Sequence, residues 1–364
     1  MSGRLFIFAG GGTGGHLYPG LAIWRELSEM RPDARAVFVC SAKPLDAEIL
    51  ARERVACVPI PARAFGVRPK ALWRFLSAWG PSVRSSRAVI ERDAVVAAMG
   101  GYVAAPVVQA ARAEGRPVAL VNLDAVPGKA NNWIARHSAV RLTAADSSRV
   151  PARWERIAPI VRRGAVAGGD ADRCREALGL RPGVPTLVIT GGSQGAGSIN
   201  ALAAGLARRR PEVFRGWQVL HQTGERDASG AAEAYRAAGV HAVVTAFVSD
   251  MASAWGAATL ALARCGANTV AELWANHTPA LLLPYPYHRD EHQRFNAEPL
   301  ERAGGAVIVT DRVDEAANMG DAGEALAALL TDLPRVGAMR ASLGALGPAD
   351  GAAEAARRLI ALAG

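Results

Sequence analysis

Two short stretches of this 364-residue chain decide its fold: LFIFAGGGTGGH at residues 5–16 and TLVITGGSQGAG at residues 186–197. In each, a five-residue apolar run is followed directly by a glycine-rich loop. The apolar run predicts a buried strand, and the loop predicts a tight turn into a helix. Because this is how doubly wound domains begin, the sequence predicts two of them, one in each half.

Further apolar runs alternate with longer amphipathic segments, which is typical of parallel β-α-β units. The expected strands are 5–9, 36–40, 94–99, 118–123, 140–144 and 157–161, then 186–190, 218–221, 243–248, 260–263, 280–284 and 306–310. Glycines in 163–185 indicate the interdomain crossing. We therefore predict an α/β protein with two Rossmann-like domains, 1–162 and 163–340, and a helical tail, 341–364. The carboxyl ends of the two sets of strands are expected to face each other across one cleft.

Composition excludes several classes of protein. With 50% apolar and 21% charged residues, the chain is neither disordered, nor collagen-like, nor a disulfide scaffold. The four cysteines are scattered, which fits a reduced, cytosolic setting. The longest uncharged stretch, 94–111, is interrupted by Gly100, Gly101 and Pro106, so it predicts strand, loop and helix rather than a membrane span.

The positive charge is concentrated in the first half. Residues 1–163 hold 24 Lys and Arg against 12 Asp and Glu, whereas the remainder holds 18 against 21. A basic half suits an anionic partner such as nucleic acid, a phosphate-bearing substrate or an anionic membrane face. Alternatively, the arginines serve only solubility.

The glycine loops suggest phosphate binding. Missing Cβ atoms let backbone N–H groups approach a phosphate, and the following helix offers its positive end. The spacing is neither a dinucleotide fingerprint nor a P-loop, so a tight structural turn is the alternative for either loop alone. The second loop adds Ser193, and a third glycine pair, Gly100 and Gly101, precedes Tyr102. Three such loops indicate two phosphorylated ligands.

Six motifs in order resemble the MurG family of peripheral membrane N-acetylglucosaminyltransferases: GGTGGHLYPG (11–20), GGYVAAP (100–106), AVPGKAN (125–131), GGSQGA (191–196), HQTG (221–224) and CGANTVAE (265–272). The resemblance implies a GT-B fold and inverting transfer of N-acetylglucosamine from UDP-N-acetylglucosamine to lipid I, giving lipid II for peptidoglycan. It places the undecaprenyl-diphosphate-linked acceptor on the first domain and the UDP-sugar on the second. It implies no cofactor, metal or nucleic acid, and a peripheral location on the cytoplasmic face of the inner membrane.

Site residues carried over from the resemblance fall into three groups. His16 and Asp124 are the candidate catalytic groups. Candidate donor contacts are Thr13, Gly14, Gly15, Asp124, Arg162, Ser193 on the diphosphate, Val248 beside the uracil, Ala267, Asn268, Thr269, Glu272 on the ribose hydroxyls, and His292 and Gln293 on the sugar. Candidate contacts of the acceptor diphosphate are Gly14, Gly15, Gly100, Gly101 and Tyr102.

Plainer interpretations stay open for several of these residues. His16 could take a proton from the attacking hydroxyl, or it could only bond substrate or loop backbone. Glu272 could be an exposed helix charge. His288 and His292 flank Asp290 at a spacing that mimics a metal face, but no third ligand is evident.

The segment 70–87 carries Leu72, Phe75, Leu76 and Trp79 at helical spacing, surrounded by basic residues. Such a basic amphipathic stretch can lie in an anionic membrane surface, and it matches the membrane-facing patch that the resemblance implies. The alternative is an ordinary helix packed on its own sheet.

Two segments depart from the family pattern. VNLD (121–124) stands in place of HEQN, and APIVR (158–162) in place of GNPVR. These departures keep two alternatives open: a related UDP-sugar glycosyltransferase with another lipid or metabolite acceptor, and a catalytically impaired nucleotide-sugar-binding paralogue. A UDP-sugar epimerase shares the fold but has no obvious use for the basic stretch.

Overall fold

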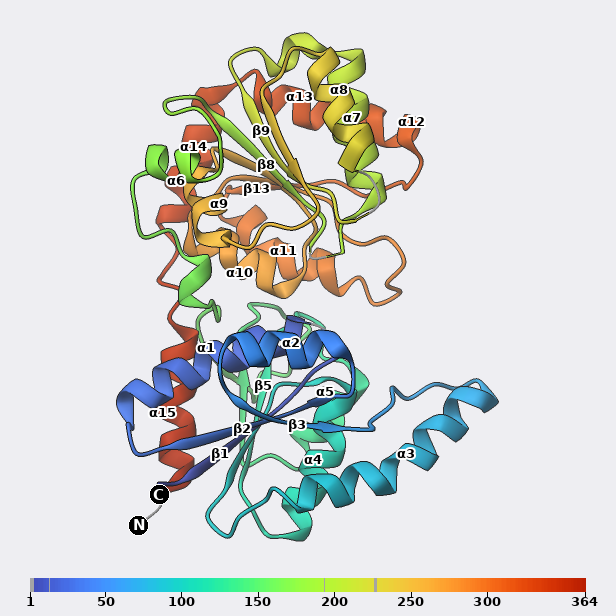
Figure 1. The fold of residues 1–364 in the computed structure, drawn as a ribbon, viewed down its shortest axis with the longest axis vertical. Coiled ribbons are helices and arrows are strands. Elements are labelled where there is room, and N and C mark those ends of the chain that lie inside the picture. The colour runs from blue at the N-terminus through green and yellow to red at the C-terminus, as the bar shows by residue number, and fades with distance from the viewer. Residues whose placement is uncertain (1–2, 13, 193, 226–227) are drawn as a thin grey trace. The chain divides into compact units, whose positions relative to one another are not determined.

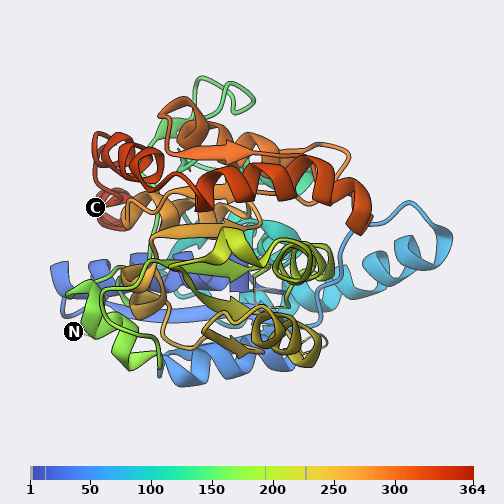
Figure 2. The same cartoon turned by 90° about the horizontal axis from the view of Figure 1, so that it is seen from above.

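The computed structural model describes residues 3–12, 14–192, 194–225 and 228–364. They divide into two compact units, Met1–Arg162 with Ala349–Gly364, and Arg163–Pro348. Each unit holds one parallel sheet with helices on both faces (Figures 1 and 2), which confirms the predicted pair of Rossmann-like folds. Two residues with predicted roles, Thr13 and Ser193, lie outside the described residues.

The first unit contains a seven-stranded sheet in the order β3-β2-β1-β4-β5-β6-β7. Its strands are β1 (Leu5–Ala9), β2 (Arg35–Ser41), β3 (Ala56–Ile60), β4 (Val95–Ala98), β5 (Val118–Asn122), β6 (Val140–Thr143) and β7 (Glu155–Arg156). Its helices are α1 (Gly14–Met30), α2 (Pro44–Arg52), α3 (Pro69–Arg87), α4 (Gly101–Ala113), α5 (Lys129–Ala135) and α15 (Gly351–Ala363). The strand order reverses between β1 and β4, so the expected ligand crevice of this sheet lies between the loops after these two strands.

The core of the first unit forms where α1 and α15 pack side by side on one face of the sheet, with α2 beside α1. Phe8 of β1 stacks on Phe38 of β2, with ring centroids 4.9 Å apart. On the opposite face α4 packs between α3 and α5. The stretch 94–111 folds as β4, a glycine turn and α4, as predicted, and no helix among the described residues is long and apolar enough to cross a bilayer.

Two strands of the first unit differ from the prediction. β3 was not expected, because only Ile60 is fully buried and Pro59 interrupts the pattern. Proline is tolerated there since β3 lies at the sheet edge. The strand expected at 157–161 is wrong, because pairing ends with β7 at Arg156. Pro159 has no N–H to donate to a ladder, and only Ile160 makes an isolated bridge, to Asp350.

The second unit contains a six-stranded sheet in the order β10-β9-β8-β11-β12-β13. Its strands are β8 (Thr186–Thr190), β9 (Gln218–Gln222), β10 (Ala242–Thr245), β11 (Leu260–Ala263), β12 (Ala280–Leu282) and β13 (Ala306–Ile308). Its α-helices are α6 (Ala171–Ala177), α7 (Gly197–Arg209), α8 (Ala228–Ala237), α9 (Met251–Ala257), α10 (Ala267–Ala275), α11 (His292–Arg302), α12 (Glu315–Asn318), α13 (Glu324–Leu330) and α14 (Leu333–Gly344). Here the order reverses between β8 and β11, so the expected ligand crevice of the second sheet lies between the loops after these two strands.

The predicted tail, 341–364, is not one element. Its first residues end α14, whose Val336, Met339 and Leu343 are buried in the second unit. The rest forms α15, which packs in the first unit through an alanine-rich face. At its start Gly351 donates to the Pro159 carbonyl over 3.2 Å, and a Cβ on Gly351 would lie 1.9 Å from the oxygen of Ala158. Because Gly351 has no side chain, the start of α15 packs closely on Ala158 and Pro159, which follow β7.

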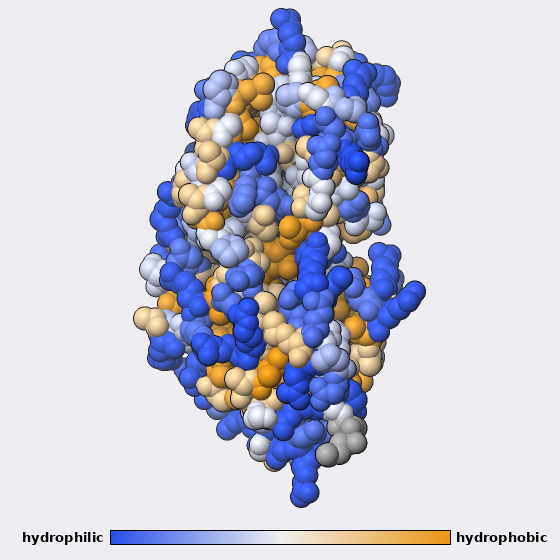
Figure 3. All heavy atoms as spheres, turned by 90° about the vertical axis from the view of Figure 1, so that its left-hand side faces the viewer, coloured by the Kyte–Doolittle hydropathy of each residue, from blue (hydrophilic) through white to orange (hydrophobic). Residues whose placement is uncertain are grey.

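Seen from the side where α1 and α15 lie, the surface is mostly hydrophilic, with small, separate hydrophobic patches (Figure 3). The segment around α3 differs: Phe65, Val67, Trp73 and Leu76 are all more than half exposed. A single exposed apolar side chain needs no explanation, but a group of them on one segment indicates a contact surface.

Candidate functional site

The crevice of the first unit brings His16 and the pair Gly100–Gly101 together. His16 lies in the first turn of α1, after the glycine loop that follows β1. Gly100 caps the start of α4 and Gly101 begins it, with φ angles of +93° and +75°. A Cβ on Gly101 would lie 3.1 Å from Nε2 of His16 and crowd the imidazole, and the positive φ of Gly101 also favours glycine.

The imidazole of His16 lies in an electrostatic environment that suits a neutral base. Burial lowers the pKa of His16 from its ordinary value of 6.5, while the negative charges of Asp124 and Asp46 oppose this effect. Nδ1 of His16 is buried without a hydrogen-bond partner among the described residues. The direction of this shift favours the neutral form of the imidazole.

Asp124 follows β5, which lies next to β4 in the sheet. Its backbone position is fixed by Asn122, which is fully buried and donates to the Asp124 carbonyl over 2.8 Å and to Thr143 over 3.1 Å. Asn131 of α5 in turn donates to Asn122 over 2.9 Å. This pair of buried amides holds the loop that carries Asp124. Asn122 and Asp124 both belong to the VNLD segment, which departs from the family pattern. The departure therefore introduces the hydrogen bonds of Asn122 as well as the carboxylate of Asp124.

Arg162 and Tyr102 lie beside the same glycine loop. The guanidinium of Arg162 stacks on the ring of Tyr18, 4.3 Å from its centroid, and its buried Nε has no hydrogen-bond partner among the described residues. The hydroxyl of Tyr102 would lie 2.6 Å from a Cβ on Gly12, so Tyr102 covers the loop. The first unit thus holds the phenol of Tyr102 against the glycine turn, Asp124 close enough for its charge to act on His16, and the guanidinium of Arg162 on Tyr18 of α1.

In the second unit, two loops pack against each other at the carboxyl ends of β8 and β9. Gly195 has a φ of +71°, and a Cβ there would lie 1.9 Å from the Thr223 carbonyl oxygen. Gln222 links the loops: its amide donates to the Gly192 carbonyl over 2.8 Å, and its oxygen accepts from the Val248 N–H over 2.8 Å. Gln222 therefore fixes Val248 relative to the glycine loop.

Ala267, Asn268 and Thr269 form the first turn of α10, directly after β11. Their backbone N–H groups have no partner within the helix, so this end favours an anion. Glu272 lies one turn further on. It is half-buried, and its Oε2 accepts from the indole N–H of Trp255 over 2.8 Å. Glu272 is therefore not a freely solvated helix charge.

His292 and Gln293 begin α11. Nδ1 of His292 lies 2.8 Å from Asp290, and its ring stacks on His288 at 4.3 Å. The oxygen of Gln293 accepts from the Tyr285 N–H over 2.9 Å and from the Cys265 N–H over 3.3 Å, which leaves its NH₂ as the group to offer a ligand. Among the described residues no three His, Cys, Asp or Glu side chains are grouped to hold a metal ion.

Comparisons with known proteins agree with this architecture. Residues 6–140 match the glycosyltransferase family 28 N-terminal domain, and residues 186–328 match the glycosyltransferase family 28 C-terminal domain. Two curated relatives, from Moorella thermoacetica and Chlorobium luteolum, are 33% and 34% identical over 92% and 98% of this chain, and over 96% and 98% of their own length. Both are named UDP-N-acetylglucosamine–N-acetylmuramyl-(pentapeptide) pyrophosphoryl-undecaprenol N-acetylglucosamine transferase.

This chain belongs to glycosyltransferase family 28, in its MurG branch. Among solved structures, MurG from Acinetobacter baumannii has a TM-score of 0.74 at 23% identity, covering 99% of both chains. UGT71G1 from Medicago truncatula has a TM-score of 0.62 at 13% identity, covering 100% of this chain and 99% of that one. These likenesses show the GT-B fold, which is therefore confirmed; that the two sheets face each other across a cleft stays a prediction.

The membrane patch expected in this MurG-family chain needs correction. Phe75 and Trp79 are half-buried, because they join an aromatic cluster with Phe65 and Trp133. Leu72 and Leu76 are exposed, and among the large hydrophobic side chains of α3 Trp73 is the most exposed, at 68%. Helical spacing does not reveal that Phe75 and Trp79 pack on other aromatic rings, and contact of this face with a membrane stays a prediction.

Sequence reasoning missed three residues that build these sites, namely Asp46, Trp255 and Arg264. Arg264 follows β11 and pairs over 2.7 Å with Asp311, whose side chain is fully buried. Burial works to raise the pKa of Asp311, but hydrogen bonds from Ser198, Asn318 and the Val313 N–H, together with Arg264, lower it. The pair ties the loop after β11 to the segment after β13, and Ser198 at the start of α7 hydrogen-bonds to both side chains. An arginine directly after a buried strand is the one sequence signal that could have identified it.

Proposed function

We propose that this chain is an inverting N-acetylglucosaminyltransferase that transfers N-acetylglucosamine from UDP-N-acetylglucosamine to the muramyl 4-hydroxyl of lipid I, forming lipid II in peptidoglycan synthesis. The observation that carries the proposal is the near-full-length identity of about one third with relatives named for this transfer. The residues gathered in each crevice suit the two phosphorylated ligands that the reaction requires.

The donor would bind in the second unit. Its diphosphate takes the free N–H groups at the start of α10, where Ala267, Asn268 and Thr269 lie. Glu272 accepts from the ribose hydroxyls, held in orientation by Trp255. Val248 lies beside the uracil, and Gln293 with His292 bonds the sugar. Every one of these groups follows a strand at the same edge of the sheet, which is where ligands of this fold bind.

The acceptor would bind in the first unit, with its diphosphate on the N–H groups of Gly14 and Gly15 and beside Gly100, Gly101 and Tyr102. His16 takes the proton of the 4-hydroxyl as its oxygen bonds to the anomeric carbon and the bond from that carbon to UDP breaks. The lowered pKa of His16 supports this role, since a base must be unprotonated at working pH. The negative charge left on UDP is stabilised by the end of α10.

Asp124 is the competing candidate for the base. Its carboxylate could accept the proton, or stabilise positive charge developing on the sugar ring. It also brings a negative charge near a diphosphate, which Arg162 is placed to offset, because both lie around the same glycine loop. We favour His16, since GGTGGHLYPG matches the family pattern throughout whereas VNLD does not.

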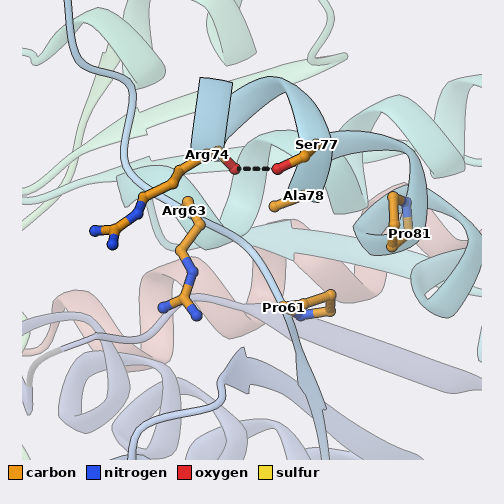
Figure 4. A pocket seen from close by; sticks show the side chains of 6 residues that line it. All are labelled: Pro61, Arg63, Arg74, Ser77, Ala78 and Pro81. Atoms are coloured by element: carbon orange, nitrogen blue, oxygen red, sulfur yellow. Dashed lines mark hydrogen bonds between the residues drawn. The ribbon is translucent and has the colours of Figure 1, made fainter. Parts of the chain in front are cut away.

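We further propose that α3 and the loop before it dock the protein peripherally on the cytoplasmic face of an anionic membrane. Beside the exposed Trp73 and Leu76 lies a pocket of about 490 Å³, lined by Pro61, Arg63, Arg74, Ser77, Ala78 and Pro81. Figure 4 shows the guanidinium groups of Arg63 and Arg74 on the same side of this pocket. A neighbouring pocket adds Arg68 and Lys70, and none of these four cations has a side-chain partner among the described residues. Residues 54–90 contain seven Lys and Arg and no carboxylate, so the charge is left for lipid phosphates.

The test is an assay of purified protein with radiolabelled UDP-N-acetylglucosamine and lipid I, read by product mobility. Formation of lipid II supports the proposal. Binding of UDP-N-acetylglucosamine without product from lipid I or any other lipid acceptor would identify an impaired paralogue, and product only from another acceptor would identify a related transferase. These controls are needed because Asp124 stands where the family pattern has Asn.

A further inference from the structure

A buried carboxylate lies beneath the glycine loop of the first unit, and the mechanism above does not use it. Asp46, in the first turn of α2, is fully buried. Its Oδ2 accepts from the Gly12 N–H over 2.7 Å, from the Ser41 N–H over 3.0 Å and from the Ser41 hydroxyl over 2.7 Å. Its Oδ1 is buried with no hydrogen-bond partner among the described residues. Three hydrogen-bond donors therefore converge on one oxygen of this buried side chain.

The carboxylate of Asp46 can pack against the loop because the loop residues are glycines. A Cβ on Gly11 would lie 2.4 Å from Oδ2 of Asp46, closer than any real side chain allows. Gly12 has a φ of +90°, and its carbonyl accepts from the ammonium of Lys43 over 2.7 Å. The N–H and the carbonyl of Gly12 are therefore both hydrogen-bonded to side chains that follow β2, those of Asp46 and Lys43.

An inward N–H of a glycine loop is normally a place for a ligand anion. Here the N–H of Gly12 is already taken by Asp46, and the negative charge of Asp46 repels a second anion from the same hollow. A diphosphate is then directed to the N–H groups of Gly14 and Gly15, in the first turn of α1 beside His16 in the sequence.

We propose that Asp46 is a positioning residue that fills the anion-binding hollow of loop 10–12 with a carboxylate of the protein itself and so directs the acceptor diphosphate to the start of α1. The kinetic side of this inference rests on the proposed function. The structural side does not, since it concerns the loop and its affinity for anions alone.

The first experiment uses calorimetry with inorganic diphosphate as the probe, on the full chain and on Asp46→Asn, which keeps the shape and removes the charge. We expect Asp46→Asn to bind diphosphate about three- to tenfold more tightly, as loss of a nearby like charge predicts. Ser41→Ala is the matched control, because it removes one hydrogen bond to the same oxygen and keeps the charge, and it should bind as the parent does. Equal or weaker binding by Asp46→Asn would overturn the proposal.

The second experiment measures amide hydrogen exchange in residues 10–15, in case Asp46→Asn folds poorly. Lys43 is exposed, so Lys43→Gln should fold, and it removes the other tether of Gly12. We expect faster exchange confined to this loop in both variants, and unchanged diphosphate affinity or a slight loss in Lys43→Gln. Exchange at the parental rate in both would contradict the positioning role.

Transfer kinetics complete the test. A displaced diphosphate should lower kcat with lipid I about tenfold or more in Asp46→Asn while the KM for UDP-N-acetylglucosamine stays unchanged, because misplaced reactants lose the alignment that catalysis needs. If the parental chain transfers nothing, the proposed function fails and the binding and exchange results still decide the role of Asp46. A rise in the donor KM instead would assign Asp46 to general stability.

Discussion

Glu272 is held by a contact that no local pattern reveals, since its carboxylate accepts from the indole of Trp255 on the preceding helix, α9. If Glu272 also bonds the ribose, Glu272→Ala should weaken UDP binding by about 1.5–3 kcal/mol, the range for hydrogen bonds to a charged group. Calorimetry with UDP measures this. Glu272→Gln keeps an acceptor for Trp255 and should lose less. An unchanged UDP affinity in folded Glu272→Ala would remove this residue from the donor site.

His16 and Asp124 can be separated by the pH dependence of transfer. If His16 is the base, activity rises as the imidazole loses its proton, and the acid limb lies below pH 6.5 because burial lowers the pKa of His16. The charge of Asp124 raises that pKa, so Asp124→Asn should move the acid limb to still lower pH and tighten UDP-sugar binding. His16→Ala should lose nearly all activity and keep UDP binding. A fully active His16→Ala protein would shift the role to Asp124.

At the scale of the element, α3 exposes an apolar surface that the rest of the first unit does not cover. Replacing Trp73 and Leu76 with Ser should abolish liposome binding and leave the melting temperature and UDP binding unchanged, since both side chains are exposed. Leu45→Ser on α2, where Leu45 is 40% exposed, is the matched control and should bind liposomes normally. By contrast, Phe75→Ser or Trp79→Ser should destabilise the aromatic cluster. Liposome binding is measured by flotation. If the double variant at Trp73 and Leu76 floats with liposomes as the parent does, α3 is not the docking element.

The start of α15 is a second element whose role depends on close packing. Gly351→Ala would place a Cβ 1.9 Å from the Ala158 oxygen, so α15 must shift, and we expect a loss of about 1–3 kcal/mol in the free energy of unfolding. Urea denaturation measures it. Gly347→Ala is the control, because no atom lies within 4 Å of a Cβ there. Equal stability of the two variants would show that α15 tolerates displacement.

At the scale of the whole molecule, the excess positive charge belongs to the first half of the chain, and four of its cations line the pockets beside α3. Arg63→Gln with Arg74→Gln should weaken binding to anionic vesicles by about 1 kcal/mol per residue, with no effect on neutral vesicles. The difference should vanish as salt screens the charges. Arg35→Gln, which breaks a pair with Glu91, removes the same charge elsewhere and should change vesicle binding less. If Arg35→Gln weakened vesicle binding as much per charge as the Arg63 and Arg74 changes, the attraction would come from the overall positive charge and not from the pocket.

Much of the fold follows from the sequence because its signals are local. Eleven of the twelve expected strands form, since runs such as Leu5–Ala9 and Thr186–Thr190 are buried on both faces and therefore apolar throughout. The exceptions have local causes as well: β3 is an exposed edge strand with Pro59, and Pro159 prevents pairing at 157–161. The glycine loops could be located for the same reason.

What only the tertiary structure decided is which groups meet across long sequence separations. The sequence explained Gly11 and Gly12 by the approach of a ligand, yet the atoms that need their space belong to Asp46 and Tyr102. In the same way, no local pattern pairs Trp255 with Glu272, turns Phe75 and Trp79 inward, or sends α15 back to the first unit. Secondary structure depends on hydrophobic periodicity and turn chemistry, which neighbouring residues carry. Site geometry depends on packing, and packing joins residues that the sequence keeps far apart.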